Sequence, residues 1–286
     1  MNSDWTKAAI TTYSPDAILS GIVPALNRFI GRETGLEHAG AFLSIHDEDS
    51  IDRFYALNWA EGAQHAALVR GLFVARPVVV THWRGPDALS RLQELKGNTQ
   101  PALARTGSIR SLFWCDNPVC NLIHVSDDVD EMEGDYRILL DRKIADVGRC
   151  NAPLYANRMP ITMVRHNALL EFQRVLTRNH LSSSSTRYRS ALPHDGGAIE
   201  TALTLIQDLM KVALSGPSTA KVLIRHFLFA RDDFRAVAAK YLGARSSWED
   251  LVITCGIESN NLWLEQLRHD RAGERTFEYF MDTADA

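Results

Sequence analysis

The chain has 286 residues, of which 45% are hydrophobic and 23% are charged. This composition is ordinary for a globular protein and excludes a disordered chain, a collagen-like chain and a disulfide scaffold. The formal net charge is -4, so no overall field draws the molecule to nucleic acid or to an anionic membrane. Any site for a phosphate group must therefore be local.

The start of the chain, Met1-Asn2-Ser3-Asp4, lacks the basic segment and apolar core of a signal peptide. No apolar run approaches the ~18 residues that a membrane span needs. These features predict a cytoplasmic protein with no membrane partner. The cysteines Cys115, Cys120, Cys150 and Cys255 follow no framework spacing, so we expect free thiols in a reducing cytosol.

Residues 1–150 alternate strand-like patterns with amphipathic helical patterns. Strands are expected at residues 7–12, 40–45, 77–83 and 120–124, and helices near residues 18–29, 51–56, 61–72, 86–95 and 129–140. The run at 77–83 is β-branched and stops before Gly85-Pro86, so it is expected at the centre of a sheet. The alternation predicts an α/β (α+β) fold, a ferredoxin-like split βαβ sandwich with a mixed sheet and helices on one face.

Residues 151–286 contain almost no strand signal and are expected to form an all-α domain of unknown role. Helices are predicted near residues 163–177, 198–214, 219–230, 231–242 and 260–268. Residues 181–197 carry a serine run, Pro193 and Gly196-Gly197, which predicts a mobile loop. The basic residues around it, Arg174, Arg178, Arg187 and Arg189, either contact an anionic substrate or partner or form a solvated face. The change of pattern predicts two domains, residues 1–150 and 151–286.

Four motifs follow one another in the first half of the chain. They are the strand Arg76-Pro-Val-Val-Val-Thr-His-Trp-Arg-Gly85, the loop Gly97-Asn-Thr-Gln-Pro101, the turn Thr106-Gly-Ser-Ile-Arg110 and the strand end Asn121-Leu-Ile-His-Val-Ser-Asp127. Nucleoside diphosphate kinases read PVVAMVWEG, GETNP, PGTIR and NIIHGSD in the same order and at similar separations. The chain therefore resembles the nucleoside diphosphate kinase family over about residues 7–140.

The resemblance implies covalent catalysis by His124. This histidine would attack the terminal phosphate of a nucleoside triphosphate, carry the phosphoryl group and pass it to a nucleoside diphosphate. Ser126 matches the family serine that hydrogen-bonds near the histidine. Asp135 falls where the family has a glutamate that holds the other ring nitrogen and fixes the tautomer, and its shorter side chain would reach directly or through a water.

The resemblance also implies phosphate-binding residues. Thr99 and Arg110 match family residues that bind phosphate oxygens, a task that suits the planar guanidinium. Asn121 matches a residue that touches the ribose and phosphates. The implied cofactor is Mg²⁺ bound with the nucleotide, and the implied partner is a nucleoside triphosphate or diphosphate.

Several positions depart from the family pattern. The family lysine before Pro-Asp is Ser14, the arginine before the GETNP loop is Gln93, the stacking aromatic aligns approximately with Gln64, and the glycine after the histidine is Val125. Losing one preorganised charged donor to a transferring phosphoryl group costs ~10²- to ~10³-fold in rate. The neighbouring basic residues that could substitute are Arg84, Arg91, Lys96 and Arg105.

Other interpretations remain open from sequence. His124 taken alone would be interpreted as a structural histidine at a strand end, and its motif favours the functional role. Asp135 lies in an acidic helix whose charges a solvated face would explain. Cys115, Cys120 and His124 lack the paired spacing of structural zinc sites, so no metal site is predicted. Besides the enzyme, the chain fits a catalytically degenerate regulatory module that senses nucleotide and signals through its C-terminal helices. A third interpretation is a fold that merely builds a homo-oligomer.

Overall fold

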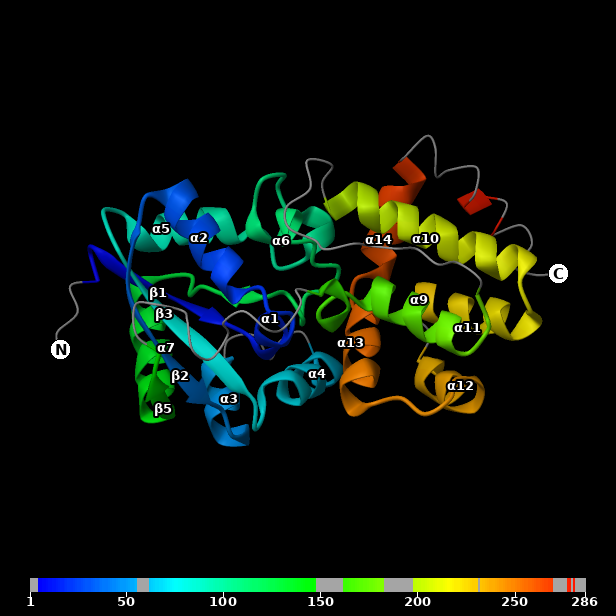
Figure 1. Ribbon diagram of the computed structural model, residues 1–286, viewed down its shortest axis with the longest axis horizontal. Helices are drawn as coiled ribbons and strands as arrows, with labels where there is room; N and C mark the ends of the chain where they lie inside the picture. The colour runs from blue at the N-terminus through cyan, green and yellow to red at the C-terminus, as the bar shows by residue number, and fades with distance from the viewer. Residues whose placement is uncertain are drawn as a thin grey trace.

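The computed structural model describes residues 5–55, 62–147, 162–182, 198–230, 232–269, 277–278 and 280 (Figure 1). The described residues up to 147, here called the first part, contain five strands: β1 (Ala8–Tyr13), β2 (Glu37–Ile45), β3 (Pro77–Arg84), β4 (Ile123–His124) and β5 (Lys143–Asp146). Its helices are α1 (Pro15–Leu19), α2 (Val23–Thr34), α3 (Glu48–Phe54), α4 (Ala63–Phe73), α5 (Ala88–Lys96), the 3-10 turn η2 (Pro101–Leu103), α6 (Ile109–Leu112) and α7 (Val129–Asp141).

The strands form one sheet in the order β4-β1-β3-β2-β5, with β3 at its centre as predicted. All four pairings are antiparallel, so the expected mixed sheet is wrong. The reason is that β3 lies between β1 and β2 and runs against both, which separates the two strands that a βαβ crossover would otherwise pair. This split βαβ order is the predicted ferredoxin-like arrangement, extended by the unpredicted edge strand β5.

Helices cover both faces of the sheet, which corrects the expectation of a single covered face. Tyr13 of β1 donates to Asn27 of α2 at 2.5 Å on one face. On the other face, the ring of His82 of β3 lies 5.2 Å from that of Tyr136 of α7. His82 pairs with Ile10 of β1, so these two side chains share a face of the sheet. Tyr13 is three positions from Ile10, and because side chains alternate along a strand it faces the opposite side. Both faces of β1 are therefore buried.

The described part of the second half is helical, as predicted. It contains the 3-10 turn η3 (Met163–Arg165) and the helices α9 (Ala168–Arg178), α10 (Ala198–Ser215), α11 (Ser218–Leu228), α12 (Phe234–Tyr241), α13 (Ser247–Ile257) and α14 (Asn260–His269). Aromatic packing ties α9 to α11, because the rings of Phe172 and Phe227 lie 4.2 Å apart. In the described residues, no helix is both long and apolar enough to cross a membrane.

The expectations for the basic cluster and for the cysteines can be compared with the structure only at the described residues. Arg174 and Arg178 both pair with Glu249 of α13, so these two members of the basic cluster join helices rather than form a solvated face. Arg187, Arg189 and nearly all of the expected mobile loop lie outside the described residues. Cys115, Cys120 and Cys255 are free and buried, as expected, and Cys150 lies outside the described residues.

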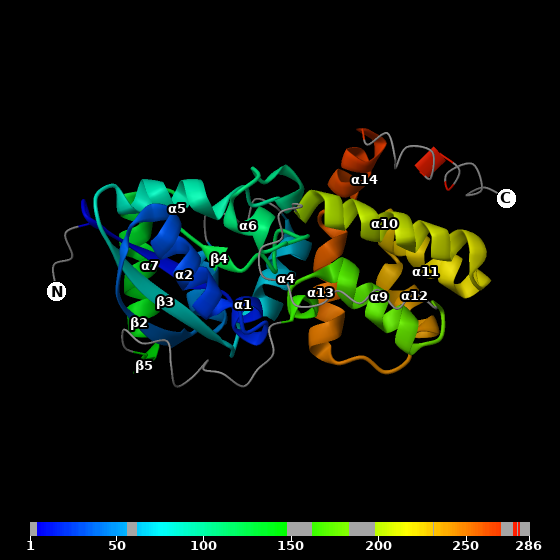
Figure 2. The same cartoon turned by 45° about the horizontal axis from the view of Figure 1, so that its top comes forward.

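The helical part lies beside the first part in both views (Figure 1, Figure 2), and a buried polar network joins the two. The carboxylate of Asp116 accepts the backbone N–H groups of Ala168 and Leu169 at 3.0 and 2.7 Å, which caps the start of α9. Trp263 of α14 donates its indole N–H to the backbone oxygen of Asp116 at 2.7 Å. One residue of the first part thus holds two helices of the second.

His166 in this network predicts acid sensitivity of the fold. Burial lowers its pKa to about 4, while Nδ1 lies 2.8 Å from the Ser20 hydroxyl and Nε2 lies 3.2 Å from the Phe113 carbonyl. An unfolded histidine takes up a proton near pH 6.5 and the folded one does not, so stability is lost as pH falls from about 6.5 to 4.

The expected contribution of His166 is a loss of roughly 2 to 3 kcal/mol in the free energy of unfolding between pH 7 and pH 4.5. Denaturant unfolding of wild type and His166→Gln at both pH values measures it, because the variant should lose that much less. Other buried titrating groups, such as Asp116, are common to both proteins and cancel in the comparison. Equal losses in the two proteins would contradict the assignment.

Candidate active site

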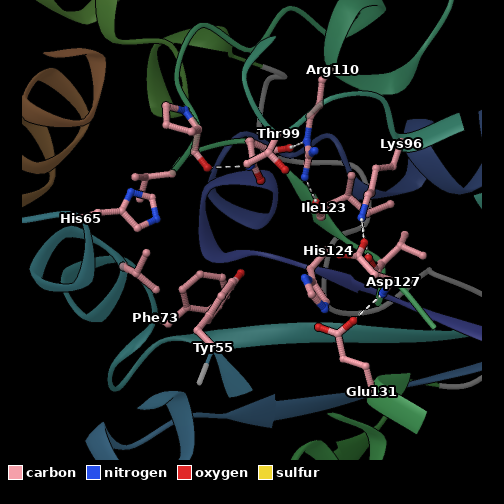
Figure 3. A pocket seen from close by; sticks show the side chains of 15 residues that line it. Tyr55, His65, Phe73, Lys96, Thr99, Arg110, Ile123, His124, Asp127 and Glu131 are labelled. Atoms are coloured by element: carbon pink, nitrogen blue, oxygen red, sulfur yellow. Dashed lines mark hydrogen bonds and ion pairs between the residues drawn. The ribbon is translucent and has the colours of Figure 1, made fainter. Parts of the chain in front are cut away.

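His124 lies at the end of β4 and lines a cavity between the sheet, α4 and the loop after α5 (Figure 3). The backbone before it adopts a left-handed conformation at Leu122, with φ of 73°. Such a conformation costs about 1–3 kcal/mol for a residue other than glycine. The buried carboxylate of Asp16 accepts the Leu122 N–H at 3.1 Å, so the aspartate of the Pro-Asp pair that follows Ser14 helps to hold β4, the strand that carries His124.

The structure brings the three predicted catalytic residues together. Nε2 of His124 lies 2.9 Å from Oδ2 of Asp135, and the Ser126 hydroxyl donates to the same oxygen at 2.7 Å. Asp135 therefore reaches the ring directly, without a bridging water. It is buried, and it points from α7 toward the strand end. The acidic face expected for this helix does not include Asp135.

Two aromatic rings that the sequence analysis missed surround the histidine. Phe54 and Tyr55, at the end of α3, place their rings 4.9 and 5.7 Å from that of His124. Burial raises the pKa of the Tyr55 phenol, so it keeps its proton and remains a hydrogen-bond donor. Their position at the end of a helical pattern gave no sign that they lie beside the histidine.

Arg110 lines the cavity, but most of its guanidinium hydrogen bonds go to backbone oxygens of the protein. It donates to the backbone oxygens of Ile123 at 2.8 Å and Gly97 at 3.0 Å, with a longer contact of 3.4 Å to Asn121. These bonds tie the loop after α5 to the histidine strand. Burial lowers the pKa of Arg110, yet an arginine remains charged at neutral pH.

Lys96 supplies a second cation to the cavity. Its ammonium donates to the Val125 carbonyl at 2.6 Å and lies 3.4 Å from Asp127. Burial lowers the pKa of Lys96. Arg91 instead donates to Thr34, and Arg105 pairs with Glu94 at the surface. Lys96 is therefore the best placed of the basic residues that the sequence offered as substitutes.

The remaining predicted residues also line the cavity. Thr99 comes from the loop after α5, and Asn121 from the segment before β4. The Asn121 amide donates to the Pro118 carbonyl at 2.6 Å, which fixes the side chain. Four of the six predicted residues thus line the cavity: His124, Arg110, Thr99 and Asn121. Asp135 and Ser126 do not line it, and Asp135 bonds to the His124 ring.

The departures from the family pattern have structural consequences. Gln93 donates to the backbone oxygens of Ser126 at 2.9 Å and Asp127 at 2.6 Å, so it braces the turn after the histidine. Ser14 is buried and Gln64 is exposed, and neither is among the described residues that line the cavity. The next residue along the chain, His65, does line it.

One face of α4 forms a wall of the cavity that the sequence analysis did not predict. His65, Val69 and Phe73 recur every fourth residue and all line the cavity, as expected for one face of a helix. Figure 3 shows His65, Phe73 and Tyr55 at one end and Lys96, Asp127 and Glu131 at the other. The helical spacing was visible in the sequence, but it did not reveal which face meets the cavity.

Among the described residues, one group has the spacing of a metal site. His124, Glu131 and Asp135 offer ligand atoms within 4.8 Å of one another. Each already has a partner, because Asp135 binds both His124 and Ser126, and Glu131 accepts the Asp127 backbone N–H. Hydrogen bonding thus accounts for the group without an ion.

The sheet order and the histidine-lined cavity define a ferredoxin-like α/β protein, and comparisons with known proteins identify its family. The family model described as nucleoside diphosphate kinase matches residues 9–144. A nucleoside diphosphate kinase of Halorubrum lacusprofundi is 30% identical over 138 residues, which cover 47% of this chain and 84% of the relative. That of Symbiobacterium thermophilum is 39% identical over 124 residues, covering 43% of this chain and 80% of the relative. The chain therefore belongs to the nucleoside diphosphate kinase family.

A solved structure of a halophilic nucleoside diphosphate kinase from Halobacterium salinarum in complex with CDP is also similar. It is 24% identical, covers 49% of this chain and 91% of that chain, and gives a TM-score of 0.42. Like the family model and the two relatives, this match covers about half of the chain. Residues after 144 lie outside the family model.

Proposed function

We propose that this chain is a phosphotransferase that moves the γ-phosphoryl group of a nucleoside triphosphate to a nucleoside diphosphate through a phosphohistidine at His124. The observation that carries the proposal is the 2.9 Å bond between His124 Nε2 and Asp135. A carboxylate at Nε2 favours the tautomer protonated there, which leaves the lone pair of Nδ1 for a ligand in the cavity. Residues 1–150 would form the catalytic domain, and residues 151–286 the helical domain.

The proposed reaction has two matched halves. The Nδ1 lone pair of His124 forms a bond to the γ-phosphorus, and the bond from that phosphorus to the bridging oxygen breaks, leaving its electron pair on the departing diphosphate. Asp135 stabilises the positive charge that the ring gains. A terminal phosphate oxygen of the acceptor diphosphate then attacks the phosphorus, and the electron pair of the breaking nitrogen–phosphorus bond returns to Nδ1.

Side chains at the charged end of the cavity would hold the phosphates. Lys96 and the unused N–H groups of Arg110 offer positive charge, and Thr99 and Asn121 offer neutral polar groups. Lys96 would replace the cation lost at Gln93. The carboxylates of Asp127 and Glu131, which also line the cavity, would be oxygen ligands of the kind that Mg²⁺ prefers, and the ion would offset phosphate charge if it is bound with the nucleotide.

A regulatory module that binds nucleotide without turnover is the second candidate. It is favoured by Gln93, whose amide braces the turn after His124 where the family has an arginine, and by Ser14 in place of a lysine. The Arg110 guanidinium also favours this candidate, because its bonds to the backbone oxygens of Gly97 and Ile123 leave fewer N–H groups for a phosphate. A homo-oligomeric scaffold is a third candidate. Measuring the size of the protein in solution together with a nucleotide titration would distinguish it from the other two.

Incubation with γ-labelled ATP and Mg²⁺ tests the first proposal. We expect acid-labile, base-stable label on His124, found by mass spectrometry, that chases onto added nucleoside diphosphate. His124→Ala should abolish the label, whereas His269→Ala, at the exposed end of α14, should leave it unchanged. Nucleotide binding with no label on the wild type would reject the transferase and support the regulatory module.

A further inference from the structure

The junction between α13 and α14 contacts the candidate nucleotide site from outside the family-matched residues. Glu258 and Ser259 form this junction. Oε2 of Glu258 lies 3.5 Å from Nδ1 of His65, which lines the cavity. The Ser259 hydroxyl donates to the side-chain oxygen of Gln100 at 2.8 Å. Two consecutive residues of the helical part therefore contact His65, which lines the cavity, and Gln100, which adjoins the cavity-lining Thr99.

The first wall is α4. Its cavity-lining face carries His65, Val69 and Phe73, and another face packs against α13. The two helices approach closely at Gly71, which has no side chain. A Cβ at this position would lie 3.2 Å from a methyl group of Leu251 on α13. Interiors packed this tightly transmit displacement rather than absorb it. A shift of α13 would therefore move the histidine face of α4.

The second wall is the loop after α5. Gln100 follows the cavity-lining Thr99 directly, and its backbone N–H donates to Asn98 at 2.9 Å. Ser259 is fully buried and Gln100 is half-buried, so their bond is partly shielded from water and leaving it unmade is costly. The bond thus restrains the loop that carries Thr99.

The junction is itself held firmly. The Asn260 amide donates to the Phe227 carbonyl of α11 at 2.7 Å, and Trp263 of α14 donates to the Asp116 carbonyl at 2.7 Å. Asn260, Phe227 and Trp263 belong to the helical part and Asp116 to the first part, and all four are buried. Bonds to α11 and to Asp116 therefore fix the position of the junction.

We propose that Glu258 and Ser259 are positioning residues that set nucleotide affinity by holding His65 and the loop at Gln100. The inference rests on the proposed function, because it assumes that the cavity binds nucleotide. His65 lies at the aromatic end of the cavity, away from Lys96 and Asp127 (Figure 3). An apolar, aromatic end suits the nucleoside and a charged end suits the phosphates. Loss of either contact therefore weakens nucleotide binding more than it slows the transfer step.

Titration calorimetry of the full chain with ADP and Mg²⁺ tests this proposal without requiring turnover. Glu258→Gln and Ser259→Ala should each raise the Kd for ADP by about 3- to 10-fold. Glu265→Gln, an exposed change on α14, should leave it unchanged. In the phosphoryl-transfer assay, the same two variants should raise KM and leave kcat near the wild-type value.

A double-mutant cycle separates positioning from general loss of structure. If Ser259 acts through Gln100, the double variant Ser259→Ala, Gln100→Ala should bind ADP no more weakly than the weaker-binding single variant. Independent multiplication of the two effects would overturn this route. Melting temperatures of all variants identify any that fail to fold. If Ser259→Ala does not fold, the Kd of Glu258→Gln still tests the proposal.

The outcomes distinguish this inference from the proposed function. Kd values within about twofold of wild type in both Glu258→Gln and Ser259→Ala would overturn the positioning role, whatever the labelling of His124 shows. Wild-type protein that binds ADP but takes up no label would reject the transferase alone. Wild-type protein that binds no ADP would overturn both.

Discussion

Asp135→Asn should lower kcat for phosphoryl transfer by about 10²- to 10⁴-fold while leaving the fold intact. The carboxylate of Asp135 accepts from Nε2 of His124 at 2.9 Å and from Ser126 at 2.7 Å. An asparagine either donates its N–H to Nε2, which places the ring proton on Nδ1 and removes the nucleophilic lone pair, or presents its oxygen without the negative charge. Both arrangements disfavour a ring that must become positively charged.

Rapid-quench measurement of label transfer from ATP to the protein measures this effect directly. Asp135→Glu restores the residue that the family has at this position and should retain most of the activity. Asp141→Asn, an exposed change at the end of the same helix, should leave the rate unchanged. A rate for Asp135→Asn within about threefold of wild type would show that the carboxylate only supports the structure.

The sequence predicted that Ser126 and Asp135 lie beside His124 because the motif fixes their order along one strand and the following helix, α7. Thr99 and Arg110 come from earlier segments and were predicted only through the resemblance to the family. The sequence could not predict that Lys96, rather than Arg84, Arg91 or Arg105, faces the cavity. Between Lys96 and Arg91, which share α5, the choice depends on the rotation of that helix about its axis against β1, which is a property of tertiary packing. For the same reason, neither Tyr55 nor the cavity-lining face of α4 could be recognised before the fold was known.

The fold was predicted best where local patterns are strong. The β-branched run of β3 lies at the sheet centre as predicted, whereas β5 was missed because all four of its residues are exposed at an edge and lack an alternating pattern. The helix α13 was also missed, since Val252, Ile253 and Thr254 favour strands. Its capping box, formed by Ser246 and Glu249, was the available signal.

Antiparallel pairing could not be read from the strands themselves. β1 and β3 are buried on both faces, so their near-continuous apolar runs match those of parallel strands with helices on either side. Only the insertion of β3 between β1 and β2 decides the direction of each pair. That insertion depends on contacts between residues far apart in the sequence, which no local pattern encodes.

Arg110→Met should reduce both stability and activity, because Arg110 joins the loop after α5 to β4, the strand that carries His124. Its guanidinium donates to the backbone oxygens of Gly97 at 3.0 Å and Ile123 at 2.8 Å, and the side chain is buried. A buried carbonyl left without its donor costs about 1–3 kcal/mol. We therefore expect the free energy of unfolding to fall by roughly 2 to 5 kcal/mol, and kcat/KM to fall by at least about 10²-fold.

Denaturant unfolding and steady-state kinetics of the folded variant measure the two effects separately. Arg105→Met is the matched control, because Arg105 is exposed and its pair with Glu94 at 3.3 Å is worth only about 0–1 kcal/mol. Lost stability with normal kcat/KM would make Arg110 a structural link with no contact to phosphate. Lost activity at unchanged stability would show that the backbone bonds of Arg110 contribute little, and that the guanidinium acts on the ligand.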